Sequence, residues 1–367
     1  MRSLLTLACL ALVAGCSNET ETPPEGDPRE AVLSTIVEQV AIPTYQTFRD
    51  EAVALDAAAE AFCADRTAAS LTTVQEAWWT ARGSWKRNDI FAFGPHTDEP
   101  VRLGPKIDFW PARPDTVQRT LDGTAELDAA GIESLGAPAK GLPAMEYLLY
   151  DPSGDHSAIL AAYTDETSGD RRCQYLIGLA GDLVLRADEM LAAWDGMGGF
   201  GEALVTAGEG SPLYDSRAMA INTLFNRITF AAEDIRELKI GKPAGKRNGG
   251  DPQPDTVESP FSHRSAQDIV DSLAGLRAAY AGTAENVSFD AQVEGRAPEL
   301  TTALQDHFDR ATTAVQAIDT PLASAVVDRP DEVEAAYQAV KDLHRALGVD
   351  AANVLGITVM FNNTDAD

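Results

Sequence analysis

The spacing of apolar residues limits this chain to helices along nearly its whole length. Between Leu71 and Trp85 the apolar positions recur every three or four residues, which is the period of a helix with one buried face. The same spacing marks stretches at 176–194, 216–239 and 333–347, whereas the alternation typical of a strand is nearly absent. Because short connections between long helices favour antiparallel neighbours, the sequence predicts an all-α fold of antiparallel helical bundles.

The chain length and a glycine-rich stretch indicate two folded domains. The protein has 367 residues, and a domain typically takes about 100–200. Glycines gather between Gly196 and Gly210. The G-M-G-G-F-G sequence there follows a helical stretch and not a strand, so it predicts a linker and not a phosphate-binding loop. We predict an N-terminal helical bundle at 28–200 and a C-terminal helical bundle at 201–367.

The first residues have the pattern of an export signal. Arg2 precedes an apolar run that is too short to cross a bilayer, and the sequence V-A-G-C ending at Cys16 resembles a bacterial lipobox. The resemblance implies a lipoprotein signal peptide at 1–15 and a lipid anchor, including palmitate, at Cys16. A plain signal peptide is the alternative. Ser17 favours the outer membrane, and residues 16–27, which are poor in apolar side chains, predict a flexible tether.

The charge of the chain restricts its partners. The formal net charge is -28, which excludes nucleic acid because phosphate contacts require a basic surface. An acidic exterior suits solubility, cations or basic partners. We therefore expect a protein of the bacterial cell envelope that faces the periplasm or the surface and has no nucleic-acid partner.

Two cysteines remain in the predicted mature protein. Cys63 and Cys173 form an even pair, and an exported protein folds in an oxidising compartment. Both positions lie at the ends of predicted helices. We predict a disulfide between them, at a point where the two helices pack side by side.

An aromatic stretch with many glycines and prolines follows the tryptophan-containing helix. It holds Phe91, Phe93, Phe109 and Trp110, which need burial although the prolines and glycines prevent long regular structure. We expect an ordered loop packed on the bundle, and such loops are often functional. His96 lies here without helical register, so we expect an exposed histidine and not a metal ligand.

The stretch 140–151, K-G-L-P-A-M-E-Y-L-L-Y-D, predicts a short helix that carries one carboxylate. Pro143 fits the first turn of this helix, where its missing N–H costs nothing. Glu146 lies one turn later on the same face, while Met145, Leu148 and Leu149 face the interior.

Four carboxylates are candidates for a cation-binding site. They are Asp89, Asp108, Glu146 and Glu233, the last on the polar side of its predicted helix. Each alone is typical of a solvated or helix-capping residue. If they converge in a cleft, Glu146 and Asp108 are the first candidates for metal ligands, with Trp110 beside them, because a hard cation such as iron or calcium takes several oxygen ligands.

Several stretches, in order, resemble the imelysin family, also called the M75 peptidase-like family. They include E-A-W-W-T-A-R-G-S-W-K-R-N-D-I-F-A-F-G-P, K-I-D-F-W-P, G-L-P-A-M-E-Y-L-L and L-G-I-T-V-M-F-N-N-T-D. The resemblance implies two helical bundles with a site in the cleft between them and a G-x-H-x-x-E motif. Gly141 and Glu146 match that motif, but Pro143 stands in the place of the histidine. Since proline has no side-chain donor or lone pair, a His–Glu metal pair is impossible there.

These observations leave three functional hypotheses open. The first is a non-enzymatic envelope lipoprotein that binds a metal or another ligand and serves iron acquisition, as the resemblance implies. The second is an M75-type metallopeptidase with a displaced histidine, His96 or His263. The third is a cleft for a peptide, a glycan or haem, with Phe109 and Trp110 at its wall.

Overall fold

A computed structural model describes residues 27–111, 113–282 and 287–360. The predicted signal peptide, Cys16 and most of the predicted tether lie outside these residues. The described residues form helices and connecting loops without a strand, so the all-α prediction is confirmed. No helix among them is both long enough and apolar enough to span a bilayer.

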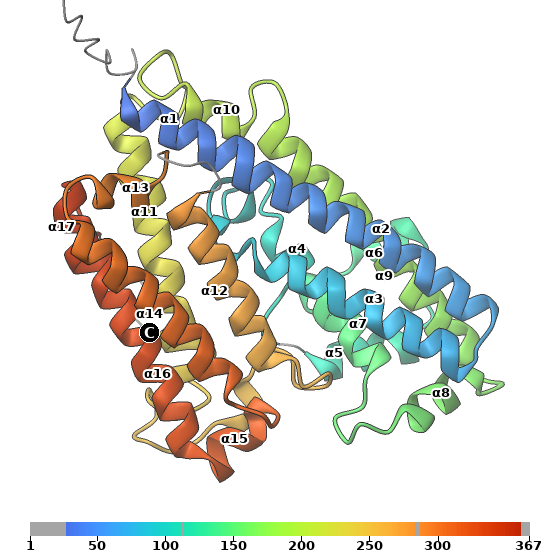
Figure 1. Ribbon diagram of the computed structural model, residues 1–367. Coiled ribbons are helices and arrows are strands. Elements are labelled where there is room, and N and C mark those ends of the chain that lie inside the picture. Colours follow the sequence, from blue (N-terminus) through green and yellow to red (C-terminus); the bar gives the residue numbers. More distant parts are fainter. Residues whose placement is uncertain (1–26, 112, 283–286, 361–367) are drawn as a thin grey trace, which may run out of the picture.

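Three long helices form the frame of the N-terminal half (Figure 1). The first runs as α1 (Pro28–Thr35), a π-helical turn (Ile36–Ala41) and α2 (Ile42–Ala64), with Pro43 in the opening turn of α2. α3 (Ala68–Lys86) and α9 (Gly169–Asp195) both pack along α2. The apolar stripe predicted for α3 is buried, since Leu71, Val74, Trp78, Ala81 and Trp85 are all at most 1% exposed.

Shorter elements fill the remaining face of this half. Their bounds are α4 (Gly104–Ile107), α5 (Pro114–Asp122), α6 (Ala129–Ser134), α7 (Gly141–Leu149), α8 (His156–Thr164) and α10 (Phe200–Val205). The aromatic stretch is an ordered loop with short 3-10 turns at Asp89–Phe91 and Gly94–His96. As expected it packs on the bundle: Phe91 and Phe93 are buried, whereas Phe109 and Trp110 are only half-buried.

The predicted linker contributes to the core. Phe200 of α10 packs edge-on against Phe93 and Trp194, with ring centroids 5.2 Å and 5.1 Å apart. The stretch between α9 and α11 is therefore part of the packed structure as well as a connection. The domain boundary at 200/201 stays a prediction.

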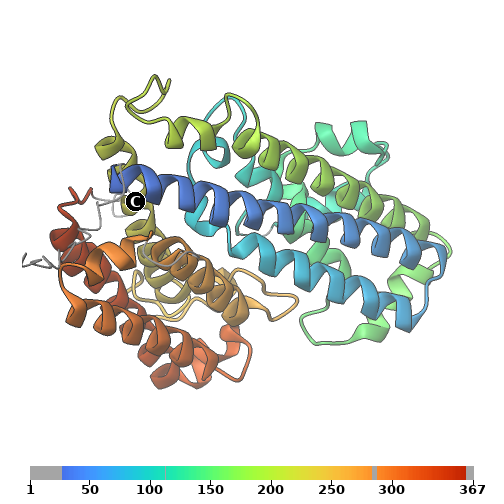
Figure 2. The ribbon, with the colours of Figure 1, turned by 45° about the horizontal axis from the view of Figure 1, so that its top comes forward.

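The C-terminal half is a second group of helices (Figure 2). α11 (Arg217–Asp234) continues through a π-helical segment (Ile235–Gly241), and a loop then leads to α12 (Ser265–Ala281). α14 (Pro298–Gln316) packs between α12 and α16 (Pro330–Arg345). The smaller elements are a 3-10 turn (Pro254–Thr256), α13 (Phe289–Glu294), α15 (Leu322–Asp328), a π-helical segment (Ala346–Ala351) and α17 (Ala352–Leu355).

The two halves approach closely where α12 meets the end of α3. A Cβ atom at Gly275 would lie 2.0 Å from the carbonyl oxygen of Arg87, so this crossing requires a glycine. The close approach brings the polar ends of α3 and α12 together, and it positions the site described below.

A disulfide joins Cys63 to Cys173, the two cysteines that the sequence analysis pairs. Cys63 lies in the last turn of α2 and Cys173 in the first turns of α9, and their Cα atoms are 5.6 Å apart. The bond therefore ties together two long helices whose bridged residues are 110 positions apart in the chain.

Candidate functional site

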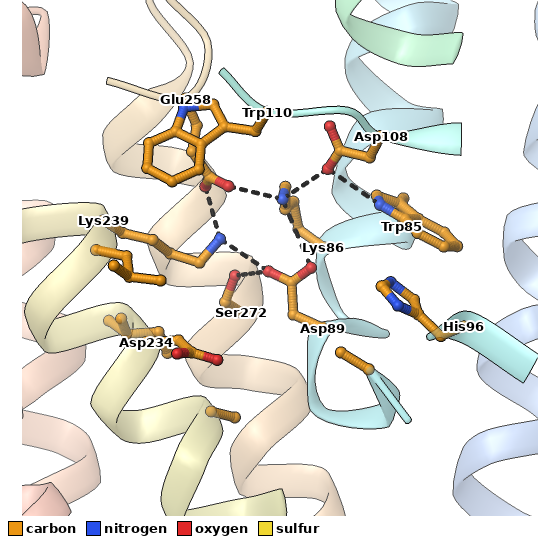
Figure 3. Close-up of a pocket in the computed structure, with 14 residues that line it drawn as sticks. Trp85, Lys86, Asp89, His96, Asp108, Trp110, Asp234, Lys239, Glu258 and Ser272 are labelled. Atoms are coloured by element: carbon orange, nitrogen blue, oxygen red, sulfur yellow. Dashed lines mark hydrogen bonds and ion pairs between the residues drawn. The ribbon is translucent and has the colours of Figure 1, made fainter. Parts of the chain in front are cut away.

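A pocket of about 170 Å³ lies between the two halves of the chain, and we call it the inter-bundle pocket (Figure 3). One wall comes from the end of α3 and the aromatic loop, and the other from α11, the π-helical segment after it and α12. The lining residues are Trp85, Lys86, Asp89, Ala92, His96, Asp108, Trp110, Ala231, Asp234, Ile235, Leu238, Lys239, Glu258 and Ser272.

Four charged side chains form a closed ring in this pocket. Lys86 and Asp89 come from the N-terminal half, and Lys239 and Glu258 come from the C-terminal half. The Lys86 Nζ lies 3.5 Å from Asp89 and 3.0 Å from Glu258. The Lys239 Nζ lies 2.9 Å from Asp89 and 2.7 Å from Glu258. Each carboxylate therefore has two ammonium neighbours, one from each half (Figure 3).

The ring holds Asp89 in its ionised form. Burial alone would raise the pKa of Asp89, but Lys239 and Lys86 together lower it to about 2. The Ser272 hydroxyl also donates to Asp89 at 2.7 Å. Asp89 thus enters the pocket as a carboxylate whose charge is already neutralised by lysines.

Asp108 is neutralised in the same way. It pairs with Arg82 at 2.5 Å and with Lys86 at 2.8 Å, and it accepts a hydrogen bond from the Trp85 indole at 3.1 Å. Although burial opposes it, these two cations hold the pKa of Asp108 well below its ordinary value. Arg82 continues the network to Asp268 of α12 at 3.2 Å.

His96 is not the exposed residue that the sequence suggested. Its imidazole stacks on the Trp85 ring, with centroids 5.6 Å apart and planes 11° from parallel. The Nδ1 atom is buried and has no hydrogen-bond partner among the described residues. Burial lowers the pKa of His96 to about 4, so the imidazole is neutral at physiological pH.

Trp110 lines the pocket, as expected for a site residue. Its indole N–H donates to the Val257 carbonyl at 3.2 Å, and the Lys242 Nζ lies 4.9 Å from the ring centroid. Trp110 therefore gives the pocket a partly exposed indole surface beside its charged ring, whereas the Trp85 ring is buried and stacked against His96.

Glu146 lies outside the inter-bundle pocket and contacts the loop before α12. α7 begins as expected, with Pro143 in its first turn and Glu146 buried. The Glu146 Oε1 accepts hydrogen bonds from the Phe261 N–H at 3.1 Å, the Ser262 N–H at 2.8 Å and the Ser262 hydroxyl at 2.7 Å. Glu146 thus ties the N-terminal half to the loop before α12 and does not line the inter-bundle pocket.

Gly141 fixes the position of α7. Its φ of +66° is left-handed, and a Cβ atom there would lie 2.1 Å from the Ile107 carbonyl oxygen. Any other residue would therefore displace the start of α7 from the end of α4. The motif residues Gly141, Pro143 and Glu146 therefore help to position α7. Glu146 does so by binding the loop of the C-terminal half before α12.

Glu146 should make the stability of the protein depend on pH. Burial raises its pKa from 4.5 to about 7, although the hydrogen bonds from Ser262 oppose the shift. A carboxyl group whose pKa is higher in the folded chain stabilises the fold below its ordinary pKa, and this contribution is lost as pH rises through 7. We expect Glu146→Gln to raise the free energy of unfolding by up to about 3 kcal/mol at pH 8 and to change it little at pH 4. Urea unfolding of both proteins at the two pH values checks this, and equal differences at both would contradict it.

The four candidate carboxylates do not converge on one point. Asp89 and Asp108 meet around Lys86, Glu146 binds the 261–262 backbone, and Glu233 lines a separate pocket near the C-terminus. Within the described residues no group of three or more His, Cys, Asp or Glu side chains is placed to hold a metal ion. The expected all-oxygen site of Glu146 and Asp108 is therefore not formed in this structure, because Asp108 is paired with Arg82 and Lys86 while Glu146 accepts hydrogen bonds from residues 261 and 262.

The two histidines of the peptidase hypothesis lie in different pockets. His96 belongs to the inter-bundle pocket, and His263 lines a third pocket together with His156 and Gln75. Neither His96 nor His263 is among the described hydrogen-bond partners of Glu146.

Sequence reasoning missed Arg82, Lys86, Lys239, Glu258 and Ser272. The burial of the first two could have been predicted from the sequence. Arg82 and Lys86 lie four and eight residues after Trp78 and so share the buried face of α3. The other three come from distant parts of the chain, and no local pattern connects them to Asp89.

Comparison with known proteins identifies the family. The family model described as imelysin, peptidase M75, matches residues 41–348. The chain belongs to the imelysin family. It is 26% identical over 297 residues to the iron-regulated protein A of Synechococcus elongatus, a match that covers 79% of this chain and 76% of that protein.

Two solved structures of imelysin-type proteins have the same fold. One is described as an iron-regulated protein A precursor of Parabacteroides distasonis, with a TM-score of 0.76 and 21% identity. The other is an imelysin-like protein of Psychrobacter arcticum, with a TM-score of 0.73 and 16% identity. Each likeness covers 91% of this chain and 97% of the other.

Proposed function

We propose that this imelysin-family protein is a non-enzymatic envelope lipoprotein that takes part in iron acquisition by binding a small organic iron complex in the inter-bundle pocket. The observation that carries the proposal is the closed ring of Lys86, Asp89, Lys239 and Glu258. A bare cation would have to displace an ammonium group to reach these carboxylates. An organic complex can instead use the half-buried indole of Trp110 and the existing polar groups.

Three further observations support parts of this proposal. The name of the Synechococcus relative, an iron-regulated protein, supports the link to iron. The disulfide supports an oxidising compartment. The proline at position 143 and the engagement of Glu146 by Ser262 support a binding function over peptide hydrolysis, because none of the described hydrogen-bond donors to Glu146 is an imidazole.

Equilibrium dialysis with metal analysis tests the binding function. We expect the mature protein to retain about one iron per chain from ferric citrate and to retain neither ferrous ion nor calcium when these are offered alone. Ala92→Phe, which places a ring in the pocket wall, should abolish the retention, whereas Ala57→Phe on the exposed face of α2 should not. Tight binding of the bare ions by the wild-type protein would contradict the proposal, as would equal retention by both variants.

The non-enzymatic and lipoprotein parts of the proposal are tested separately. Chelator-sensitive cleavage of casein that is lost in Glu146→Ala would establish the peptidase instead. Labelling with radioactive palmitate in cells should mark the wild-type protein and leave Cys16→Ala unlabelled; equal labelling of the two would rule out this anchor.

A further inference from the structure

A second pocket of about 390 Å³ lies entirely within the C-terminal half, and we call it the tail pocket. Its walls are α11, α16, the π-helical segments that follow each of them, and the C-terminal segment 357–360. Glu233, the predicted site residue that the inter-bundle pocket does not use, is part of its lining.

Two asparagines of α11 hold the C-terminal segment in place. The Asn226 side chain donates to the Thr358 carbonyl at 2.9 Å and accepts from the Met360 N–H at 2.7 Å. The Asn222 side chain accepts from the Thr358 N–H at 3.1 Å. These hydrogen bonds involve only backbone atoms of the C-terminal segment. The side chains of Val359 and Met360 form part of the pocket wall.

The apolar lining of the tail pocket is exposed to solvent. Val349, Val359 and Met360 are 56%, 41% and 50% exposed, and they lie with Phe230 around one cavity. Large apolar side chains that gather in this way around a concave surface are typical of a binding site for an apolar group.

The polar lining favours an anion at the same place. Lys341 and Arg345 lie one turn apart on α16, and neither forms an ion pair within the described part of the chain. Arg236 is already engaged, at 2.7 Å by Glu237 and at 3.7 Å by Glu233. The lining thus holds three cations, Arg236, Lys341 and Arg345, against two acids, Glu233 and Asp342.

His344 adds a neutral donor. Arg236 NH1 lies 3.1 Å from His344 Nδ1, and because a guanidinium only donates, Nδ1 accepts and the ring proton is on Nε2. Burial, with Arg236 beside the ring, lowers the pKa of His344 to about 4, so the imidazole stays neutral. The lining therefore combines an apolar cavity, two cations that form none of the described ion pairs and an N–H group.

From this combination we infer that the tail pocket binds an amphipathic monocarboxylate, with its apolar tail against Phe230, Val349 and Met360 and its carboxylate at Lys341 and Arg345. Guanidinium and ammonium groups bind carboxylates by charge-assisted hydrogen bonds. The net charge of -28 makes such a cationic rim unusual for this protein, which favours a specific anion over general attraction.

Gly348 offers a way to close the pocket without disturbing the fold. A Cβ atom there would meet only the Thr229 methyl group, at an ordinary contact distance of 3.7 Å. Its φ is not left-handed, and leucine favours a helix more than glycine does. Gly348→Leu should therefore fill the cavity and leave the melting temperature equal to or above that of the wild type.

Calorimetric titration with octanoate at neutral pH tests the inference. We expect saturable binding at one site, binding about tenfold weaker for the double variant Lys341→Gln/Arg345→Gln, and no binding for Gly348→Leu. The double variant Arg277→Gln/Arg310→Gln removes two cations from α12 and α14 and should bind as the wild type does. Octanol should bind more weakly than octanoate. Unchanged binding by Gly348→Leu, or equal binding of octanol and octanoate, would overturn the inference.

Discussion

Replacing Lys239 with methionine is expected to destabilise the protein by about 3–5 kcal/mol, because it leaves two carboxylates close together without one of their cations. Asp89 and Glu258 both pair with the Lys239 Nζ, at 2.9 Å and 2.7 Å. The same change should create a cation site, since the oxygen atoms that surrounded the ammonium group then face an empty position. Calcium is expected to restore much of the lost stability in the variant and to leave the wild type unchanged.

Urea unfolding with and without calcium measures both effects. Lys242→Met is the matched control, because Lys242 lies near the same pocket but contacts the Trp110 ring and has no carboxylate partner among the described ion pairs. We expect that control to lose less than about 1 kcal/mol and to show no response to calcium. An equal loss in the two variants, or calcium stabilisation of the wild type, would show that the ring does not take the place of a bound metal.

Removing the disulfide is expected to cost about 4 kcal/mol, because the bond closes a loop between residues 110 positions apart and so restricts the unfolded chain. The double variant Cys63→Ala/Cys173→Ala should unfold at a lower urea concentration than the oxidised wild type. Dithiothreitol should lower the midpoint of the wild type to that of the variant and leave the variant unaffected. A wild-type midpoint that does not respond to the reductant would contradict the prediction.

The long helices of this protein are predictable because each carries its own apolar spacing. The stripe from Leu71 to Trp85 is buried as its spacing requires, and Pro143 lies in the first turn of α7, where its ring is tolerated. The cysteine pair could also be predicted, since only Cys63 and Cys173 remain once the predicted signal peptide and lipobox are set aside. In these cases the deciding information lies within a few residues or in the count of one residue type.

The site was only partly predictable because its pairings are long-range. Asp89, Asp108 and Trp110 do line the inter-bundle pocket, but the partners that change their chemistry lie far along the chain. Lys239 follows Asp89 by 150 positions and Glu258 follows Lys86 by 172, so no local pattern shows that the carboxylates are neutralised. The contact of Glu146 with Ser262 could not be predicted for the same reason, since Ser262 follows it by 116 positions.

The way in which the two halves share the four charges of the ring affects how a molecule can enter the inter-bundle pocket. Each half of the chain supplies one ammonium group and one carboxylate, and each pair is also in contact within its own half, at 3.5 Å for Lys86 with Asp89 and 2.7 Å for Lys239 with Glu258. Among the four contacts of the ring, separation of the halves breaks only the two crossing ones and leaves each half with one ammonium–carboxylate pair of zero net charge. None of the four ring charges would then be left as an isolated buried ion, which is the costly case. The ring can therefore open and close again without a bound metal ion.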